Sequence, residues 1–567
     1  MDKKNLTYFE GLYVLILVIA LVLRIVFAGT WSLSEKEAQT VNSAIVNPTT
    51  LYQLWTGALF TLFNQTELLA RLLPVLLGSA MVLLPLYLRK SIGDGVTLLV
   101  AAGIALDPGL IAISKQAGSE IVAICALFAL FLFVSQKKWT WVGVSLGVGL
   151  LSGPFYWLGL LGFLLCFAVG FLFPHTETED INDSDYAVVI VARLKKIEWK
   201  PFLTGLLVFL VMGGTFFLTR PKMLAAIPGG LLEFFQRQTP DLVVLPISNA
   251  MLGFLLAYFA VIIIGIFGIR YLSKPWRKMF VLWSIIMFLL AVAYPGRQLA
   301  DFIWCVLPLY VPAALQLTRI KLRSSENRLW IGSITAVLSV FLAYFLYSLM
   351  QYIQHAGTVV EDSQVNLYLL SALAAFVIFI MILVILAWSW SLYISLDVIT
   401  ILGVGMMLFS FVFSAMKSSG FDAKPDQLMW IQTSYFKDAD IFNITMKHLD
   451  EDRAEKDHPL IVEVDGLTSE SLLWELRNYD VYVRDVKKLA DTIQPDVVIA
   501  PSTLMPNVSE KFSGQDFIYM EFPAWSLMSS IKEWTDWALY QQPLYNQAQI
   551  IVWASLFQGS LEVTPDS

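Results

Sequence analysis

Long apolar runs, broken by short polar segments, make up most of residues 1–416. A helix that crosses a membrane needs about 20 mostly apolar residues. By that measure the pattern predicts about thirteen spanning helices. Gly153-Pro154 splits one long apolar stretch, so the segments on its two sides are two spans or a single re-entrant segment. The predicted spans are 11–29, 68–88, 95–113, 119–135, 139–153, 155–173, 201–219, 246–270, 279–294, 301–318, 329–349, 367–388 and 391–416.

Basic residues gather in alternate loops between these spans. Lys and Arg favour the cytoplasmic side of a membrane protein, so these loops place the N-terminus in the cytoplasm. An odd number of spans then puts the C-terminal segment outside, and we expect an integral protein of the plasma membrane. The cytoplasmic segments would hold Lys3, Lys4, Arg89, Lys90, Lys137, Lys138, Arg193, Lys195, Lys196, Lys200, Arg270, Lys274, Arg277, Lys278, Arg319, Lys321, Arg323 and Arg328. The outer segments would hold Lys36, Lys115, Arg220, Lys222, Arg237 and Arg297.

The composition fits a membrane protein with one soluble part. Residues of the types AVILMFWYC make up 57% of the chain and charged residues 15%, whereas soluble domains carry about 25% charged residues. These values exclude a soluble enzyme and a disordered chain. Residues 417–567 hold 12 Lys+Arg and 24 Asp+Glu, a net charge of −12, against +5 elsewhere. The 3 cysteines lie in apolar runs and the 4 histidines are scattered, which argues against a disulfide framework and a cysteine-based zinc site.

The acidic C-terminal segment shows short β-like runs that alternate with helical ones, which is typical of a layered α/β domain. It carries no glycine-rich phosphate loop and no nucleophile motif, so we expect a recognition or cover domain. The sequence therefore predicts a polytopic α-helical membrane domain over residues 1–416 and a small extracytoplasmic α/β domain over 417–567. The predicted strands are 460–464, 481–483, 496–500, 517–522 and 550–556, and the predicted helices are 469–478, 486–493 and a segment near 526–541.

Three carboxylates on the outer side are candidates for chemistry. Glu35 and Glu37 lie in the first outer loop and are suited to act as a general base or as metal ligands; the alternative is a solvated polar loop. Glu120 follows the second outer turn, close to Lys115. Ionisable groups at a membrane boundary are functional candidates by default, although Ser119 and Glu120 also match a helix cap. The outer segments 30–66, 220–245 and 351–366, with the tail, are expected to roof a cavity.

Four basic residues are candidates for binding a phosphate. Arg297 could clamp it bidentately or pair with Asp301 four residues on. Arg220 and Lys222 could serve the same purpose or snorkel at the interface. Lys115 is the fourth candidate. Arg71 is expected to pair locally with Glu67, four residues before it, in the second span.

The order of these features resembles a known family. The first outer loop is followed by Glu67-Leu68-Leu69-Ala70-Arg71-Leu72-Leu73-Pro74, then by Ala105-Leu106-Asp107-Pro108-Gly109-Leu110-Ile111 and by Ser114-Lys115-Gln116-Ala117-Gly118-Ser119-Glu120. This order is similar to that of the GT-C membrane glycosyltransferases of family 39, the protein O-mannosyltransferase and aminoarabinose-transferase type. In the tail, Leu472-Leu473-Trp474-Glu475-Leu476-Arg477-Asn478-Tyr479 and Pro495-Asp496-Val497-Val498-Ile499-Ala500 resemble the prokaryotic flippase-associated branch.

The resemblance implies a GT-C fold with its active site at the outer membrane face. The donor would be a sugar on polyprenyl phosphate, the acceptor an extracytoplasmic protein, lipid or glycan, and the transfer would invert the sugar carbon. Glu37, with Glu35, would be the base or the ligands of a divalent metal, and Glu120 would help to hold the acceptor or metal. Lys115 and Arg297 would hold the donor phosphate. Membrane lipid is a further expected partner, and nucleic acid is not.

Two departures from the family pattern open alternatives. Lys36 stands where the family has an aspartate before Glu37-Ala38, and Gly118 stands in a motif that has lost an arginine. A lysine in the acidic motif favours a degenerate GT-C relative with a structural or assembly role in a membrane complex. A lipid flippase or transporter is a third alternative, but the chain shows neither inverted repeats nor a matched pair of broken helices.

Overall fold

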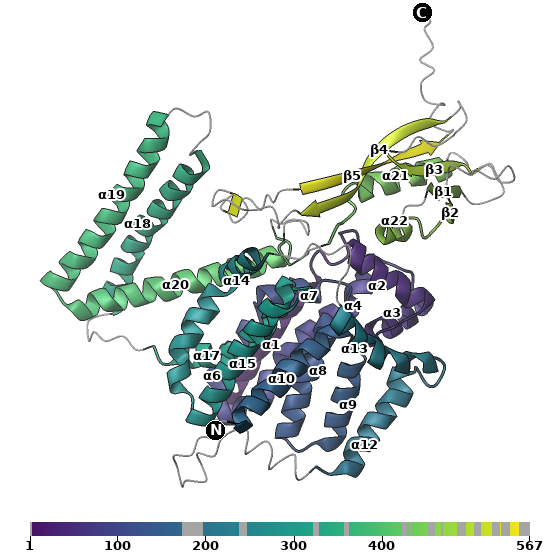
Figure 1. Cartoon of the computed structure of the whole chain (residues 1–567). Coiled ribbons are helices and arrows are strands. Elements are labelled where there is room, and N and C mark those ends of the chain that lie inside the picture. Colours follow the sequence, from purple (N-terminus) through teal and green to yellow (C-terminus); the bar gives the residue numbers. More distant parts are fainter. Residues whose placement is uncertain are drawn as a thin grey trace, which may run out of the picture.

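A computed structural model of the chain describes residues 3–172, 197–236, 246–320, 328–355, 362–421, 428–430, 433–451, 460–465, 469–484, 495–503, 512–523, 533–534 and 545–554. A body of packed helices carries a small sheet domain at one end and a helical hairpin at its side (Figure 1).

Helices that are apolar on most faces build the body, as expected for segments that contact either neighbouring helices or lipid. Their order places two short helices, α2 and α3, between the first span and the second. The helices of the body are α1 (Lys3–Ile25), α2 (Glu35–Val46), α3 (Leu51–Leu62), α4 (Glu67–Ala80), η1 (Met81–Leu88), α5 (Arg89–Ile92), α6 (Asp94–Ala105), α7 (Pro108–Ser114), α8 (Glu120–Ser135), α9 (Trp139–Leu150), α10 (Pro154–Leu172), α12 (Trp199–Val208), η3 (Phe209–Gly214), η4 (Pro221–Ala225), α13 (Ala226–Gln236), α14 (Ile247–Gly268), η5 (Ile269–Tyr271), α15 (Lys274–Ala293), η6 (Leu299–Phe302), α16 (Ile303–Val306), η7 (Leu307–Leu309) and α17 (Tyr310–Thr318).

The described residues contain 8 helical segments that are long and apolar enough to cross a membrane, or up to 9 if the bent pair α6 and α7 is one span. Shorter apolar helices are found at 120–135, 139–150, 154–169 and 199–214. The predicted polytopic membrane domain is therefore confirmed, while the count of about thirteen spans stays a prediction. Gly153 has a φ of 80°, which glycine adopts without steric cost, and it separates α9 from α10.

The break between α6 and α7 is held by buried polar side chains. Arg24 donates to the backbone oxygens of Ile104 and Ala105 at 3.1 Å, where the helix ends. Asp107 accepts from the backbone N–H of Leu110 at 2.7 Å and so caps α7. Backbone groups freed inside a membrane need such partners. The chain can therefore bend by 52° and lead into the turn 115–119, which we call the second outer turn after its predicted side of the membrane.

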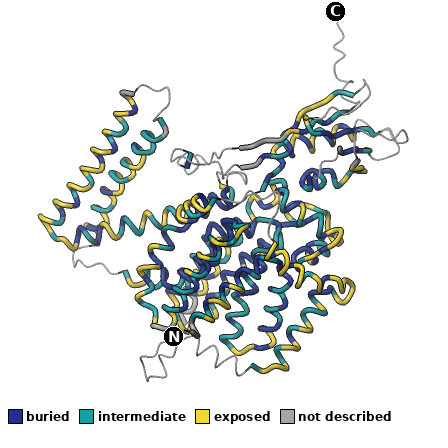
Figure 2. Tube along the Cα trace, in the orientation of Figure 1, coloured by how far each residue is buried: buried dark blue, intermediate teal, exposed yellow. Residues whose placement is uncertain are grey.

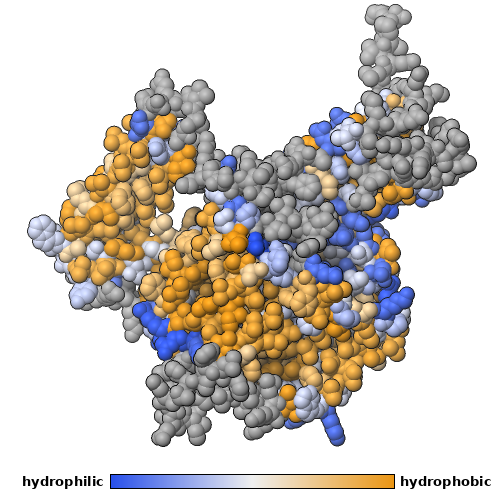
Figure 3. All heavy atoms as spheres, viewed as in Figure 1, coloured by the Kyte–Doolittle hydropathy of each residue, from blue (hydrophilic) through white to orange (hydrophobic). Residues whose placement is uncertain are grey.

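Three further helices form a unit of their own beside the body: α18 (Arg328–His355), α19 (Asp362–Ser389) and α20 (Leu392–Ser418). Helices α18 and α19 pack on each other, and α20 connects them to the body. Only 11% of the apolar window in α18 and 22% of that in α19 is buried, and Figure 2 shows the exposed positions. Hydrophobic side chains cover this hairpin and much of the body on the face seen in Figure 3, as lipid contact requires.

Within its described residues the tail domain combines five strands with two helices, which confirms the predicted α/β fold. The sheet has the order β2-β1-β3-β5-β4, with β2, β1 and β3 parallel and β5 antiparallel to both of its neighbours. Its core contains Val462, Val464, Ile499, Phe517 and, from α21, Phe442. The elements are α21 (Ala439–Glu451), β1 (Ile461–Asp465), α22 (Glu470–Glu475), β2 (Asp480–Arg484), β3 (Val497–Pro501), β4 (Ser513–Pro523) and β5 (Tyr545–Ala554).

The predicted tail elements match the observed ones only in part. Helix α21 was not predicted, and the predicted helix 469–478 is shorter at both ends. The predicted helix 486–493, and the one near 526–541 except for residues 533–534, lie outside the described residues. The domain boundary at residue 417 stays a prediction, one residue before the end of α20.

Candidate functional site

The loop 26–34, which we call the first outer loop after its predicted side of the membrane, leads into α2, and Ser34 fixes where that helix begins. The backbone N–H and the hydroxyl of Ser34 both donate to Oε2 of Glu37 at 3.0 Å. A glutamate three residues after a serine reaches back in this way in a capping box. The backbone N–H of Glu35 donates to the backbone oxygen of Ser434 at 2.8 Å. The segment between α20 and the tail domain therefore lies against the start of α2.

Glu37 is buried and bonded on both oxygens. Arg71 of α4 donates from Nε to Oε1 at 2.8 Å and from Nη2 to Oε2 at 2.9 Å. The backbone N–H of Ala117, in the second outer turn, donates to Oε1 at 2.8 Å. Burial acts to raise the pKa of Glu37, but the charge and hydrogen bonds of Arg71 outweigh it, and the pKa lies below its ordinary value. A carboxylate held in this way is a weak proton acceptor and a strong anchor.

Arg71 links the second span to the whole first loop. Its Nη1 donates to the backbone oxygens of Ala28 and Trp31 at 2.9 Å, and its Nη2 donates to that of Ser32 at 3.0 Å. The fork of five N–H groups on a guanidinium allows one side chain to bind a carboxylate and three carbonyls at once. The loop is thus fixed in the conformation that places α2.

The expected local pair between Arg71 and Glu67 is wrong. Glu67 accepts instead from Nε1 of Trp474 at 2.9 Å and from Nη2 of Arg477 at 3.2 Å, both in the tail domain. Spacing along one helix favoured the local pair, but each of the two residues has a better partner far away in the chain. Glu67 therefore serves to dock the tail on the body.

Glu35 docks the tail at a second point. Its Oε1 accepts from the backbone N–H of Glu470 at 2.6 Å, and its Oε2 accepts from the backbone N–H and hydroxyl of Ser471 at 3.1 and 2.7 Å. The hydroxyl of Ser469 donates to Oε2 at 3.0 Å. A carboxylate stabilises the N–H groups that a helix leaves unbonded at its start. Glu35 thus caps α22.

Lys36 and Glu120 form a further charged pair near the start of α2. Nζ of Lys36 lies 2.6 Å from Oε1 of Glu120, and the two side chains are 36% and 12% exposed. A Cβ at Gly118 would lie 2.2 Å from Oε2 of Glu120. The small residue in the second turn is therefore needed for Glu120 to take this position.

This pair faces a cavity of about 450 Å³ between the first outer loop, the second outer turn and the segment that leads to the tail. Two of the three expected roof segments contribute, 30–66 and, through Glu233, 220–245, together with residues before the tail domain. The segment 351–366 is not among its described lining. The lining residues are Ser34, Glu35, Lys36, Glu37, Gln39, Thr40, Ser43, Thr49, Thr50, Gln53, Gln116, Ala117, Gly118, Ser119, Glu120, Pro154, Phe155, Glu233, Gln298, Trp430, Thr433 and Ser434.

The four candidate phosphate-binding residues do not line this cavity. Nζ of Lys115 donates to the backbone oxygens of Val26, at 2.6 Å, and Ser419, and lies 4.7 Å from the Trp31 ring centroid. Arg297 donates from Nε to the backbone oxygen of Val292 at 3.1 Å.

Arg220 and Lys222 lie at the start of η4, where both are exposed. Lys36, which the sequence analysis placed in an outer segment and marked as a departure from a motif, is the one Lys or Arg among the described lining residues of the cavity.

The described residues do not form an evident metal site. Groups of three or more His, Cys, Asp or Glu that could hold a metal ion do not occur among them. N–H and O–H donors already occupy the oxygens of Glu35 and Glu37, and a cation would have to displace these donors. The two residues therefore do not fit the metal-ligand role that the sequence suggested.

No family model and no curated protein sequence matches the chain. Among solved structures it is similar to ArnT from Cupriavidus metallidurans bound to undecaprenyl phosphate, with a TM-score of 0.55 and 13% identity over 95% of this chain and 98% of that one. Apo ArnT from the same organism gives a TM-score of 0.54 and 14% identity over 96% and 98%. The apo oligosaccharyltransferase of Archaeoglobus fulgidus gives 0.41 and 14% over 88% and 70%.

The likeness to ArnT extends over nearly the full length of both chains, so it includes the membrane body and the tail domain. The chain therefore has the GT-C fold that its motif order implied. At 13% identity the likeness is one of fold, and a fold alone does not determine an activity.

The contacts of Glu35 generate a prediction about the tail. The substitution Glu35→Gln removes the charge that caps α22 and should weaken its docking by about 1 kcal/mol, the typical effect of a lost cap. Hydrogen exchange of residues 469–476 should then be faster by about fivefold. Glu10→Gln, an exposed position in α1, is the matched control. Equal exchange in Glu35→Gln and the unsubstituted protein would show that Glu35 does not hold the tail.

Proposed function

We propose that this chain transfers a monosaccharide from a polyprenyl-phosphate carrier to an acceptor outside the cytoplasm, within the cavity that Lys36 and Glu120 line. The observation that carries the proposal is this charged pair, which residues far apart in the sequence bring to the wall of a polar cavity. ArnT, which shares the fold, was crystallised with undecaprenyl phosphate. A lipid-linked donor can enter from the bilayer, so a nucleotide-binding domain is not required.

Glu120 is the carboxylate best suited to be the base. Its side chain is partly exposed in the cavity and pairs with a flexible lysine, whereas Glu37 is bound by a rigid guanidinium and Glu35 by the start of α22. A general base must reach the proton that it removes. The contacts therefore favour Glu120 as the base, with Glu37 and Glu35 as positioning residues.

The reaction can be written with these groups in place. The acceptor hydroxyl oxygen bonds to C1 of the sugar while the bond from C1 to the phosphate oxygen breaks. The hydroxyl proton moves to Glu120, and the bonding electrons leave with polyprenyl phosphate. Attack opposite the leaving group inverts C1. The ammonium group of Lys36 would stabilise the negative charge on the departing phosphate.

Glu120→Gln should abolish transfer without unfolding the protein. Loss of a general base lowers a rate by about 100-fold or more. Purified protein in lipid vesicles would be assayed with a panel of undecaprenyl-phosphate-linked hexoses and pentoses, and Glu10→Gln serves as the control. If the unsubstituted protein transfers sugar and Glu120→Gln does so at the same rate, Glu120 is not the base.

A second candidate function is a structural or assembly role in a membrane complex. Lys36 in the acidic motif and the full engagement of Glu37 and Glu35 favour it, because neither carboxylate is left for chemistry. Under this alternative the unsubstituted protein would show no turnover of any lipid-linked sugar. It would instead copurify in fixed stoichiometry with other membrane proteins.

We also propose that the N-terminus is cytoplasmic and the tail domain extracytoplasmic, as the basic loops suggest. In intact cells, a membrane-impermeant maleimide should label Asp516→Cys, on an exposed position of β4. The same reagent should label Lys90→Cys, an exposed position of α5, next to Arg89 that contacts Phe9 of α1, only after the cells are opened. The reverse pattern would contradict this orientation and would place the cavity in the cytoplasm.

A further inference from the structure

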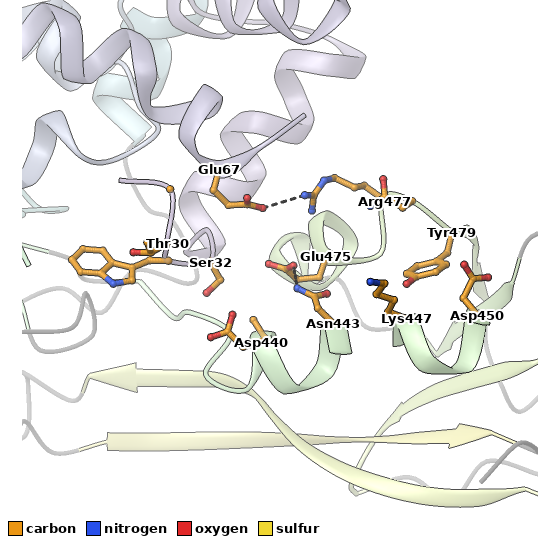
Figure 4. Close-up of a pocket in the computed structure, with 14 residues that line it drawn as sticks. Thr30, Ser32, Glu67, Asp440, Asn443, Lys447, Asp450, Glu475, Arg477 and Tyr479 are labelled. Carbon is orange, nitrogen blue, oxygen red and sulfur yellow. Dashed lines mark hydrogen bonds and ion pairs between the residues drawn. The ribbon is translucent and has the colours of Figure 1, made fainter. Parts of the chain in front are cut away.

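A second cavity lies between the membrane body and the tail domain. It has a volume of about 500 Å³ and is lined by residues 29–32 and Glu67 on the body and by α21 and residues 475–479 on the tail. Figure 4 shows polar side chains from both parts directed into this space, which we call the interdomain cleft. The cleft shares no lining residue with the cavity of Lys36 and Glu120.

Carboxylates outnumber cations in the interdomain cleft. Its cations are Lys447 and Arg477, and each has an acidic partner: Arg477 lies 3.2 Å from Glu67, and Lys447 lies 3.6 Å from Glu451, outside the lining. The other lining carboxylates are Asp440, Asp450 and Glu475. None of these three forms an ion pair with a described residue, so among the described lining residues four carboxylates face two cations.

Glu475 is the most informative of the three. Its relative exposure is only 6%, yet it forms a single hydrogen bond, which Nδ2 of Asn443 donates to Oε2 at 2.7 Å. Among the described residues no donor binds its other oxygen. Burial raises the pKa of Glu475 above its ordinary value, and the charge of Glu67 adds to this effect, while the hydrogen bond from Asn443 and the charge of Arg477 oppose it. A cation in the cleft would compensate this buried charge.

The carboxylates are too dispersed for one metal ion, since the described residues contain no group that could hold one. A ligand must therefore carry its positive charges at separate points. The volume lies within the range of about 300–1,000 Å³ that is usual for ligand pockets. The net charge of −12 over residues 417–567 would draw such a ligand towards the tail.

We propose that the interdomain cleft binds a linear ligand that carries two or more ammonium groups, which Asp440, Asp450 and Glu475 receive. A polyamine and a lysine-bearing chain share this chemistry. Because the cleft and the cavity are separate, this binding does not require that the protein transfers sugar. If the protein does transfer sugar, the bound ligand would lie next to the transfer site. Residues 29–32 line the cleft and residues 34–37 line the cavity, and Arg71 binds both segments.

Calorimetry on the purified full chain in a neutral detergent tests the proposal, with spermidine and tetralysine as separate probes. At least one probe should bind, and the affinity should fall as salt is raised. Asp440→Asn with Asp450→Asn should weaken binding by about tenfold or more, and Glu475→Gln should do the same. Asp516→Asn removes the same charge from an exposed site on β4, away from the cleft, and should leave the affinity unchanged.

The outcomes separate the two sources of ammonium groups. Binding of spermidine alone selects a small polyamine, and binding of tetralysine alone selects a peptide-like chain. If neither binds, or if the substituted proteins bind as tightly as the original, the proposal is wrong. Asp440 and Asp450 are exposed, so their substitution keeps the test valid even if Glu475→Gln fails to fold. A loss of transfer in Glu120→Gln with intact binding would show that the two sites are independent.

Discussion

The buried ion pair between Arg71 and Glu37 is the interaction on which the face of the membrane body next to the tail domain depends. The two side chains are 4% and 7% exposed, so each charge needs the other to offset the cost of leaving water. Through the same two residues, α4 is tied to the carbonyls of the first loop and to the turn at Ala117. The two walls of the cavity that the first loop and the turn at Ala117 form are therefore tied together by one charged contact.

The acidic residues around this ion pair have different roles. Glu37 anchors the loop, while Glu35 and Glu67 hold the tail domain through α22 and through Trp474 and Arg477. The pair of Glu120 with Lys36 lines the cavity and is not tied to the tail domain or to Arg71 by a described contact. The tail is thus more than a cover, because it completes one wall of the interdomain cleft and orders the start of α2.

The sequence predicted the membrane body, the α/β tail and the order of motifs, because apolar runs and strand patterns are local properties. It also selected Glu37 and Glu120, which do lie close to one cavity. It failed where the partner is distant: Arg71 pairs 34 positions away with Glu37, and Arg477 lies 410 positions from Glu67. No local spacing encodes such pairs. From the motif, Lys36 favoured a degenerate relative, and this alternative stays a prediction; only the fold reveals that Glu120 is the partner of Lys36.

A double-mutant cycle between Glu37 and Arg71 tests the central claim most directly. Thermal unfolding of the purified protein would be compared for Glu37→Gln, Arg71→Gln and the combination of both. Each single substitution leaves a buried charge without its partner and should destabilise the protein by about 3–5 kcal/mol. The combined loss should be smaller than the sum by at least about 1 kcal/mol. Additive losses, or a Glu37→Gln protein as stable as the original, would contradict the account.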